Sequence, residues 1–324
     1  MELSFKNDVE AIDAFVEKYA ELKKEIAKVI VGQDDIVKNV LMAMFSRSHA
    51  LLIGVPGLAK TLMITTIAQA VNLTFNRIQF TPDLMPSDIM GTEILDENRK
   101  FKFVKGPIFA NIVLADEINR TPPKTQSALL EAMQERSVSM NGITYNLPDP
   151  FFVLATQNPI EQEGTYPLPE AQQDRFMFNI YLDYPSFQEE VDIVKTTIHG
   201  EMQVPKQILS VDEIIFYQKL LQKIPIPENI YKYAVNLVTM TRPNTSKAHQ
   251  WANDYLTWGA GPRASQFLLV GARTHAVLNG KYSPDIEDVK SVAHNILRHR
   301  IIKNYKAEAE GISVENIIDE LLKV

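Results

Sequence analysis

The chain has 324 residues, of which 45% are hydrophobic and 23% charged, and its formal net charge is −7. This length is enough for about two domains with a large core. The negative charge disfavours a protein that binds nucleic acid through an overall positive potential, and the lack of cysteine excludes disulfides and thiolate metal sites.

The N-terminus reads as two helices rather than as a targeting segment. Apolar residues spaced three or four apart predict a helix over residues 8–30, and a second helix is predicted over 33–46. The first residues lack the shape of a signal peptide, and apolar runs stay shorter than the ~18 residues that a membrane span needs. We therefore expect a soluble, cytoplasmic protein.

Between residues 50 and 182, short apolar runs alternate with helical segments. Strands are predicted at 50–53, 76–80, 111–115, 151–155 and 178–182, and helices near 60–71 and 122–136. This alternation indicates an α/β fold with a parallel five-stranded sheet flanked by helices. Because ligands of such sheets bind at the carboxyl ends of the strands, we expect Gly54, Asp116 and Asn158 to converge at one edge.

Two short hairpins interrupt this alternation. Residues 138–145 alternate around Asn141-Gly142, a strong signal for a two-residue turn. Residues 93–104 are a weaker candidate with a charged tip. Both hairpins could cover the edge of the sheet or form functional surfaces, and the sequence does not decide between these two roles.

After Pro185 the pattern becomes almost entirely helical. We predict an α/β domain over residues 1–185 and a smaller helical domain over 186–324. The Ser-x-x-Glu patterns at 186–189 and 210–213 are capping boxes, and Ser283-Pro284-Asp285 predicts a helix with proline at its first position. The polar stretch 243–254 is predicted to be a loop.

Residues 51–61 combine an apolar run, a turn with glycine and proline, and Lys60-Thr61 at the start of a helix. This is the layout of a phosphate-binding loop, where backbone N–H groups and the helix dipole face phosphate oxygens. Lys60 would reach the β- and γ-phosphates, and the Thr61 hydroxyl would bind Mg²⁺. The strict pattern has glycine where this chain has Ala59, so a plain strand–turn–helix unit is the alternative.

Adjacent carboxylates follow a second apolar strand, at Asp116 and Glu117. Asp116 is placed to hold Mg²⁺, and Glu117 is placed to polarise an attacking water. Paired acids after a strand are common. Their position after a phosphate loop in the same sheet strengthens their interpretation as a metal site. A third strand ends at Asn158, whose amide could orient that water; an ordinary Asn-Pro turn is equally compatible.

These residues and the helical C-terminal region resemble an AAA+ ATPase. The closer resemblance is to the MoxR family, carried by Phe80–Asp88 (FTPDLMPSD), Gly164–Gln172 (GTYPLPEAQ) and Asp174–Phe176 (DRF). It covers roughly residues 30–310, and Ala59 also occurs in that family. The resemblance implies a P-loop NTPase core of the helix-2-insert branch, with a helical lid and the two hairpins as its inserts.

The resemblance also implies roles for individual positions. Lys60 and Thr61 would belong to Walker A, Asp116 and Glu117 to Walker B, and Asn158 would be sensor 1. The implied nucleotide contacts are Val31, Gly32 and Gln33 at the adenine and Gly54, Val55, Pro56, Gly57, Leu58, Ala59, Lys60, Thr61 and Leu62 at the phosphates. Thr61 and Asp116 would bind the metal.

Two arginines take their roles from the resemblance alone. Arg175 is similar to the arginine finger that reaches the γ-phosphate of a neighbouring subunit, and Arg263 is similar to sensor 2 on the lid. Taken by themselves, the residues favour an ion pair of Arg175 with Asp174 or Glu170, and a helix cap or surface pair for Arg263.

The implied function is a magnesium-dependent ATPase that works as a homo-oligomeric ring, a hexamer, and remodels or assembles other proteins. Its implied cofactors are ATP and Mg²⁺, and its implied partner is a separate protein with a von Willebrand factor A domain. Three alternatives remain: a motor on nucleic acid, which the acidic charge disfavours, a nucleotide-switched scaffold with little hydrolysis, and a chelatase-like motor subunit.

Overall fold

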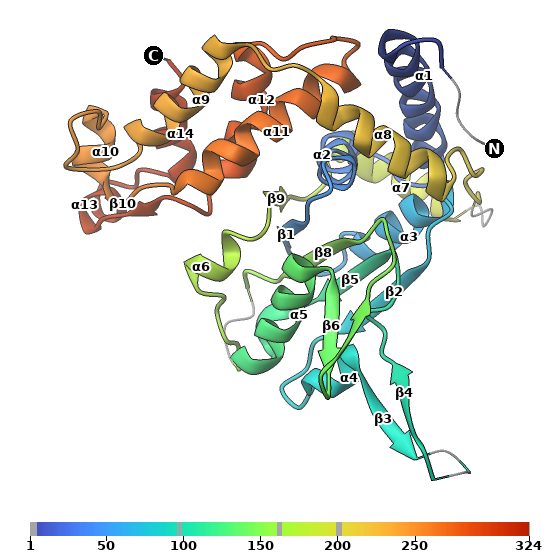
Figure 1. The fold of residues 1–324 in the computed structure, drawn as a ribbon. Helices are drawn as coiled ribbons and strands as arrows, with labels where there is room; N and C mark the ends of the chain where they lie inside the picture. Colours follow the sequence, from blue (N-terminus) through green and yellow to red (C-terminus); the bar gives the residue numbers. More distant parts are fainter. Residues whose placement is uncertain (1–4, 96, 98, 161–163, 199–202, 324) are drawn as a thin grey trace.

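The centre of the molecule is a parallel sheet of five strands, in the order β2-β5-β8-β1-β9 (Figure 1). The computed structural model describes residues 5–95, 97, 99–160, 164–198 and 203–323. The strands are β1 (Ala50–Gly54), β2 (Phe75–Gln79), β5 (Ile112–Asp116), β8 (Phe152–Gln157) and β9 (Phe178–Leu182). All four neighbouring pairs are parallel. The predicted α/β fold and the positions of the strands are confirmed.

Helices cover both faces of the sheet, and alternate residues of each strand point to opposite sides. Leu114 in β5 joins the hydrophobic cluster under α3 (Lys60–Ala70), whereas its neighbours Val113 and Ala115 join the cluster under α5 (Pro123–Glu135). All five residues of β5 are buried, as expected for a strand covered on both faces. Short elements α4 (Pro86–Met90), η1 (Ile118–Arg120) and α6 (Glu170–Gln173) lie in the connections.

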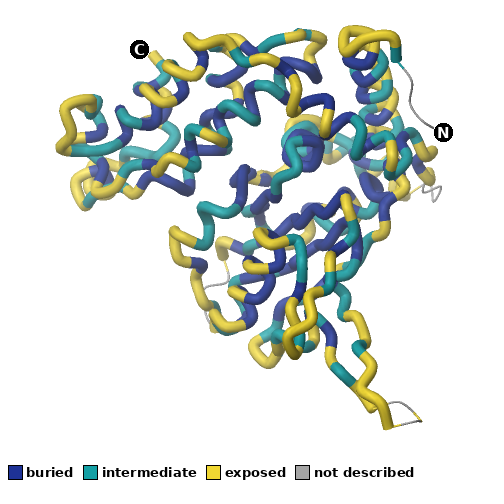
Figure 2. The backbone as a smooth tube through the Cα atoms, viewed as in Figure 1, coloured by how far each residue is buried: buried dark blue, intermediate teal, exposed yellow. Residues whose placement is uncertain are grey.

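Both predicted hairpins are present. The first consists of β3 (Gly91–Leu95) and β4 (Phe101–Lys105), and the second of β6 (Ser137–Met140) and β7 (Ile143–Asn146). The rings of Phe103 and Tyr145 stack at 4.2 Å between centroids, and Asn141 Nδ2 donates to Glu93 at 2.6 Å. The two hairpins therefore contact each other, and β3 and β4 project from the body of the protein, mostly exposed (Figures 1 and 2).

The C-terminal helices pack against the N-terminal ones. They are α7 (Phe187–Ile198), α8 (Val211–Lys223), α9 (Glu228–Met240), α10 (Gln250–Tyr255), α11 (Pro262–Leu278), α12 (Ile286–Leu297), α13 (Tyr305–Ala309) and α14 (Val314–Leu321), and the N-terminal pair is α1 (Asp8–Ala27) and α2 (Asp34–Phe45). The rings of Phe15 and Tyr217 stack at 4.4 Å, and Gln218 donates to the Met44 carbonyl at 2.8 Å. One hydrophobic cluster thus spans both ends of the chain, and a domain division at residue 185 stays a prediction.

Two local predictions in the helical region need correction. Pro284 is not the first helical residue, because Asp285 is the N-cap of α12 and accepts from the Asp288 N–H at 3.0 Å. The stretch 243–254 is not entirely loop, since α10 begins at Gln250, where His249 caps the helix. The region also holds a small antiparallel sheet, β10 (Leu256–Trp258) with β11 (Ile302–Lys303).

The two capping boxes agree with the structure. Glu213 accepts from the Ser210 N–H at 2.8 Å, and Glu189 accepts from the Ser186 N–H at 2.7 Å. In the part of the chain that the structure describes, no helix combines the length and apolar character that a bilayer crossing requires.

Candidate functional site

The turn between β1 and α3 carries two residues with positive φ. Gly57 has φ +85° and Ala59 has φ +55°. Glycine adopts this conformation without steric cost, whereas alanine does not, so Ala59 holds the tight turn at some strain. The first hydrogen bond within α3 runs from the Met63 N–H to the Ala59 carbonyl. The N–H groups before Met63 are therefore left without helical partners, as an anion site at a helix start requires.

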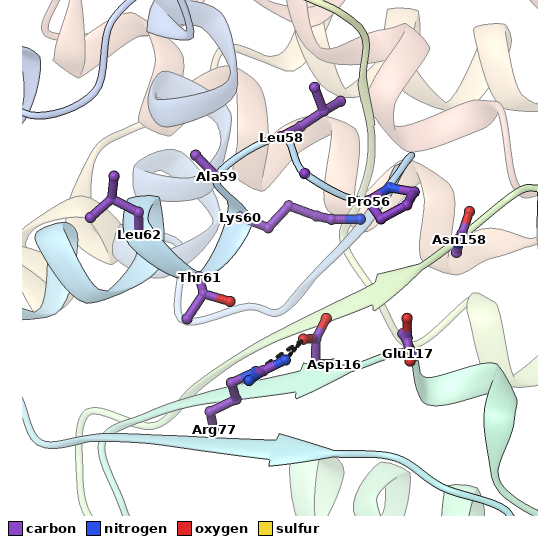
Figure 3. Close-up of a pocket in the computed structure, with 11 residues that line it drawn as sticks. Pro56, Leu58, Ala59, Lys60, Thr61, Leu62, Arg77, Asp116, Glu117 and Asn158 are labelled. Atoms are coloured by element: carbon purple, nitrogen blue, oxygen red, sulfur yellow. Dashed lines mark hydrogen bonds and ion pairs between the residues drawn. The ribbon is translucent and has the colours of Figure 1, made fainter. Parts of the chain in front are cut away.

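Polar side chains from three strand ends meet beside this turn. They surround a cavity of about 410 Å³ (Figure 3). Its lining residues are Pro56, Gly57, Leu58, Ala59, Lys60, Thr61, Leu62, Arg77, Asp116, Glu117 and Asn158. The structure thus brings together the segments that follow β1, β5 and β8, as the parallel topology predicts.

Lys60 lies inside this cavity and is half-buried. Its Nζ donates to the carbonyl oxygen of Gly54 at 2.6 Å. Burial lowers the pKa of the Lys60 ammonium, and the negative charges of Asp116 and Glu117 oppose that shift. The ammonium therefore faces the cavity as a cation with two carboxylates nearby, which suits a site for a phosphate chain with a divalent cation.

Both carboxylate oxygens of Asp116 have partners. Oδ1 accepts from the Thr156 hydroxyl at 2.6 Å, and Oδ2 accepts from Arg77 Nη2 at 2.6 Å and Nε at 3.0 Å. Sequence reasoning missed Arg77 and Thr156. A charged residue within a predicted buried strand was the available signal for Arg77, but its partner depends on the pairing of β2 with β5.

Glu117 is held in a strained backbone conformation, with φ +58° and ψ +49°. Its Oε2 accepts from Gln79 Nε2 at 2.7 Å and from Arg120 Nη1 at 3.0 Å, and its N–H donates to the Thr156 hydroxyl at 2.9 Å. One hydroxyl, that of Thr156, therefore contacts both acidic residues. Both acidic residues line the cavity.

Asn158 combines the two interpretations that the sequence leaves open. Its Oδ1 accepts from the Ile160 N–H at 3.1 Å, which closes an Asx-type turn at Asn158-Pro159. The same side chain lines the cavity opposite Lys60 (Figure 3). The turn therefore fixes the position of the amide at the site.

The segment expected to line an adenine pocket lies next to the loop. Gln33 Nε2 donates to the Leu58 carbonyl at 3.2 Å. Gly32 and Gln33 line a second cavity, of about 430 Å³, together with Tyr181–Pro185 and Glu189. The Glu189 side chain packs directly on Gly32, where a Cβ atom would come within 2.6 Å of its Cγ. Val31 is next to this cavity in sequence but does not line it.

Comparison with known proteins identifies the family. Residues 49–178 match the ATPase family associated with various cellular activities (AAA), and residues 248–321 match the AAA lid domain. The chain is 45% identical over 300 residues to Chaperone MoxR1 of Mycobacterium tuberculosis, which covers 92% of this chain and 79% of that protein. The chain belongs to the MoxR family of AAA+ ATPases. The predicted resemblance is therefore confirmed.

Another relative and a solved structure are also similar to this MoxR-family chain, in sequence and in fold. It is 30% identical over 298 residues to Protein MoxR of Methylorubrum extorquens, covering 87% of each. A solved crystal structure of a candidate ATPase from Cytophaga hutchinsonii has a TM-score of 0.91 and 44% identity, and covers 97% of this chain and 96% of that one. The AAA+ core with a C-terminal lid is thus shown for the MoxR-family chain.

The two arginines singled out by the MoxR resemblance lie outside the Lys60 cavity. Arg263 Nη1 pairs with Asp174 Oδ2 at 3.0 Å, and the other oxygen of Asp174 accepts from Arg300 Nε at 2.7 Å. Arg263 therefore forms the surface ion pair that the residues by themselves favour. Arg175 is not the partner of Asp174; it lines a separate cavity with Glu131, Glu135 and other residues of α5 and α6.

The donor set at the cavity fits Mg²⁺ bound together with a triphosphate. Such sites use one or two carboxylates, substrate phosphates and waters rather than a cage of protein ligands. Asp116 supplies a carboxylate and Thr61 a hydroxyl at the same cavity. Within the described residues, no group of three or more His, Cys, Asp or Glu side chains could hold a metal.

Proposed function

We propose that this MoxR-family protein is a magnesium-dependent ATPase that acts as an oligomeric ring, a hexamer, and remodels or assembles partner proteins. The observation that carries the proposal is the meeting of Lys60, Asp116 and Asn158 around one cavity beside a phosphate-type turn. These three residues follow separate strands, and their convergence fits the capture of a triphosphate and its cation.

Each residue of the cavity has a part in this proposal. The loop N–H groups and Lys60 bind the phosphates, and Thr61 and Asp116 would hold Mg²⁺, which neutralises phosphate charge. Glu117 orients the attacking water and accepts its proton, while the Asn158 amide fixes the position of that water. The residues at 31–33 bind the adenine, next to the loop that Gln33 contacts.

The ring is supported by the position of Arg175. This side chain lines a cavity formed by α5 and α6 rather than the Lys60 cavity of its own chain. In a ring, the α5–α6 face of one subunit would present Arg175 to the nucleotide of the next. An arginine supplied in this way stabilises the charge of the transition state by roughly 10³–10⁵ in rate.

A chaperone-like output is supported by a relative and by a surface. One relative carries the name Chaperone MoxR1. The β3–β4 hairpin exposes Ile94, Leu95, Phe101 and Val104 at its surface. Exposed apolar groups of this kind mark sites of interaction with other proteins. The proposed partners are a client polypeptide and a separate von Willebrand factor A domain protein.

The experiment that tests the proposal measures ATP binding, ATP turnover and mass in solution. Wild-type protein should bind ATP with Mg²⁺, form a closed oligomer and release phosphate, whereas Glu117→Gln should bind ATP without turnover. A wild type that binds ATP but does not hydrolyse it would favour the switched scaffold. Strong stimulation by DNA or RNA would favour a motor on nucleic acid instead.

A further inference from the structure

Arg77 is a cation inside the proposed magnesium site, and its partner there depends on the pairing of β2 with β5. It comes from β2, two positions before Gln79, which is paired in register with Asp116 of β5. Its side chain is 47% exposed, and it extends across the cavity edge to Asp116 (Figure 3). Among the described residues, its guanidinium donates hydrogen bonds to Asp116 and to Gln79 Oε1.

The contact with Asp116 falls on the oxygen that a metal would need. The buried Thr156 hydroxyl donates to Oδ1, whereas Oδ2 accepts two hydrogen bonds from Arg77, a residue that lines the cavity. Mg²⁺ binds carboxylate oxygen at about 2.0–2.1 Å and is strongly repelled by a cation held at the same oxygen. Arg77 and a metal ion therefore compete for Asp116.

We infer that Arg77 occupies the metal's position on Asp116 until nucleotide arrives, so that the divalent cation enters the site only with ATP. The inference rests on the proposed function, since it concerns the proposed magnesium site. Arg77 neutralises Asp116 beside the adjacent carboxylate of Glu117 when no metal is present. The phosphates of ATP then offer Arg77 other acceptors, and the metal that accompanies them takes the freed carboxylate. Arg77 is thus a positioning residue for the metal.

Two effects of opposite sign follow from removing this guanidinium. Without nucleotide, the unpaired Asp116 carboxylate should bind a divalent cation more tightly. Without metal, ATP should bind more weakly, because its phosphates would meet two carboxylates that lack a neutralising cation. A residue that only supports the fold would not change the two affinities in opposite directions.

The test uses Mn²⁺ as the probe, titrated by electron paramagnetic resonance into the full chain without nucleotide. Arg77→Gln should bind Mn²⁺ about tenfold or more tightly than wild type, and Arg77→Lys should stay close to wild type. The matched control is Arg47→Gln. This substitution removes a guanidinium that does not line the cavity and that pairs with Asp149 at 3.1 Å. Fluorescent ATP in excess chelator should bind Arg77→Gln more weakly than it binds wild type.

An unchanged Mn²⁺ affinity in a folded Arg77→Gln protein would overturn the inference. If that variant does not fold, the wild-type protein supplies the test. Tight binding of Mn²⁺ to wild type without nucleotide, lost in Asp116→Asn, would equally overturn the inference. Failure of the proposed function is a separate outcome. In that case wild type would not bind ATP with or without metal, while the Mn²⁺ titration would still report on Arg77 and Asp116.

Discussion

The side-chain amide of Gln79 donates to the Glu117 carboxylate at 2.7 Å, from the strand next to the one that Glu117 follows. Arg120 donates to the same oxygen, Oε2, at 3.0 Å. Two donors thus occupy one oxygen of the carboxylate and hold the side chain toward Gln79 and Arg120, which leaves that oxygen less available to a water in the cavity. Glu117 is therefore restrained in this structure.

Removal of the Gln79 amide should increase basal turnover. We expect Gln79→Ala to raise the rate of ATP hydrolysis about threefold to tenfold, because it removes one of the two bonds to Oε2. The affinity for ATP should stay the same, since Gln79 does not line the cavity. Steady-state phosphate release measures the rate. A large fall in rate would instead show that Gln79 holds Glu117 in its productive position.

The phosphate loop is tested by its lysine. Lys60→Ala should abolish detectable ATP binding, since the half-buried ammonium is the cation of the loop that faces the cavity. Calorimetric titration with ATP and Mg²⁺ measures the affinity. Lys105→Ala on the exposed β3–β4 hairpin is the control and should bind ATP normally. Wild-type affinity in the Lys60→Ala protein would remove the assignment of the loop.

The sequence revealed those site residues whose position depends only on their own strand. Lys60, Asp116 and Asn158 each follow an apolar run, and parallel topology brings the ends of such runs together. Arg77 and Gln79 escaped notice because their roles come from the pairing of β2 with β5, and the sequence of one strand does not encode its register with another.

The same distinction explains the errors outside the site. Asp285 and Pro284 are both good starting residues for a helix, and only the capping bond to Asp288 decides between them. The helix at Gln250–Tyr255 is too short for periodicity to reveal it. Asp174 pairs with Arg263 rather than with its neighbour Arg175. This pair joins segments far apart in the chain, so its geometry follows from how the lid packs on the core.

Mixed subunits test the shared site. Arg175→Ala alone should lose ATPase activity by roughly 10³-fold if its guanidinium serves the neighbouring subunit. Mixing it with Lys60→Ala subunits should restore part of the activity, because some interfaces then combine an intact loop with an intact Arg175. Phosphate release across a series of mixing ratios measures the recovery. A mixture no more active than its components would contradict the shared-site arrangement.

Arg300 should contribute far more stability than the other arginine at Asp174. Its side chain is only 2% exposed, and it donates to Asp174 Oδ1 and to the carbonyls of Asp174, Phe176, Met177 and Ile296. Arg300→Met should lower the free energy of unfolding by about 3 kcal/mol, since it removes the buried donor that these acceptors share. Arg263→Met, with a half-exposed side chain, should cost less than about 1 kcal/mol. Urea unfolding measures the free energy of unfolding of both variants. Equal losses in the two would contradict the larger contribution expected of Arg300.

Stability should fall on mild acidification because of His49. The ring is buried, its Nδ1 accepts from the Val153 N–H at 3.0 Å, and its Nε2 lies 3.2 Å from the Met133 carbonyl, so the folded protein requires the neutral form. Burial lowers the pKa of His49 from 6.5 to about 4. The unfolded chain therefore binds a proton at His49 first as the pH falls, and stability that is complete above pH 6.5 is lost between 6.5 and 4.

His49 should account for about 2 kcal/mol of the stability lost between roughly pH 7 and 5, taken from its shift in pKa. His49→Asn retains an acceptor for the Val153 N–H but does not titrate in this range. The variant should start from a lower free energy of unfolding at neutral pH and lose less of it on acidification. Urea unfolding at both pH values measures the difference in slope. The buried ring of His299, whose pKa burial also lowers, acts in both proteins and cancels in the comparison. Parallel pH profiles for wild type and variant would mean that His49 can accept a proton without loss of its bond to Val153.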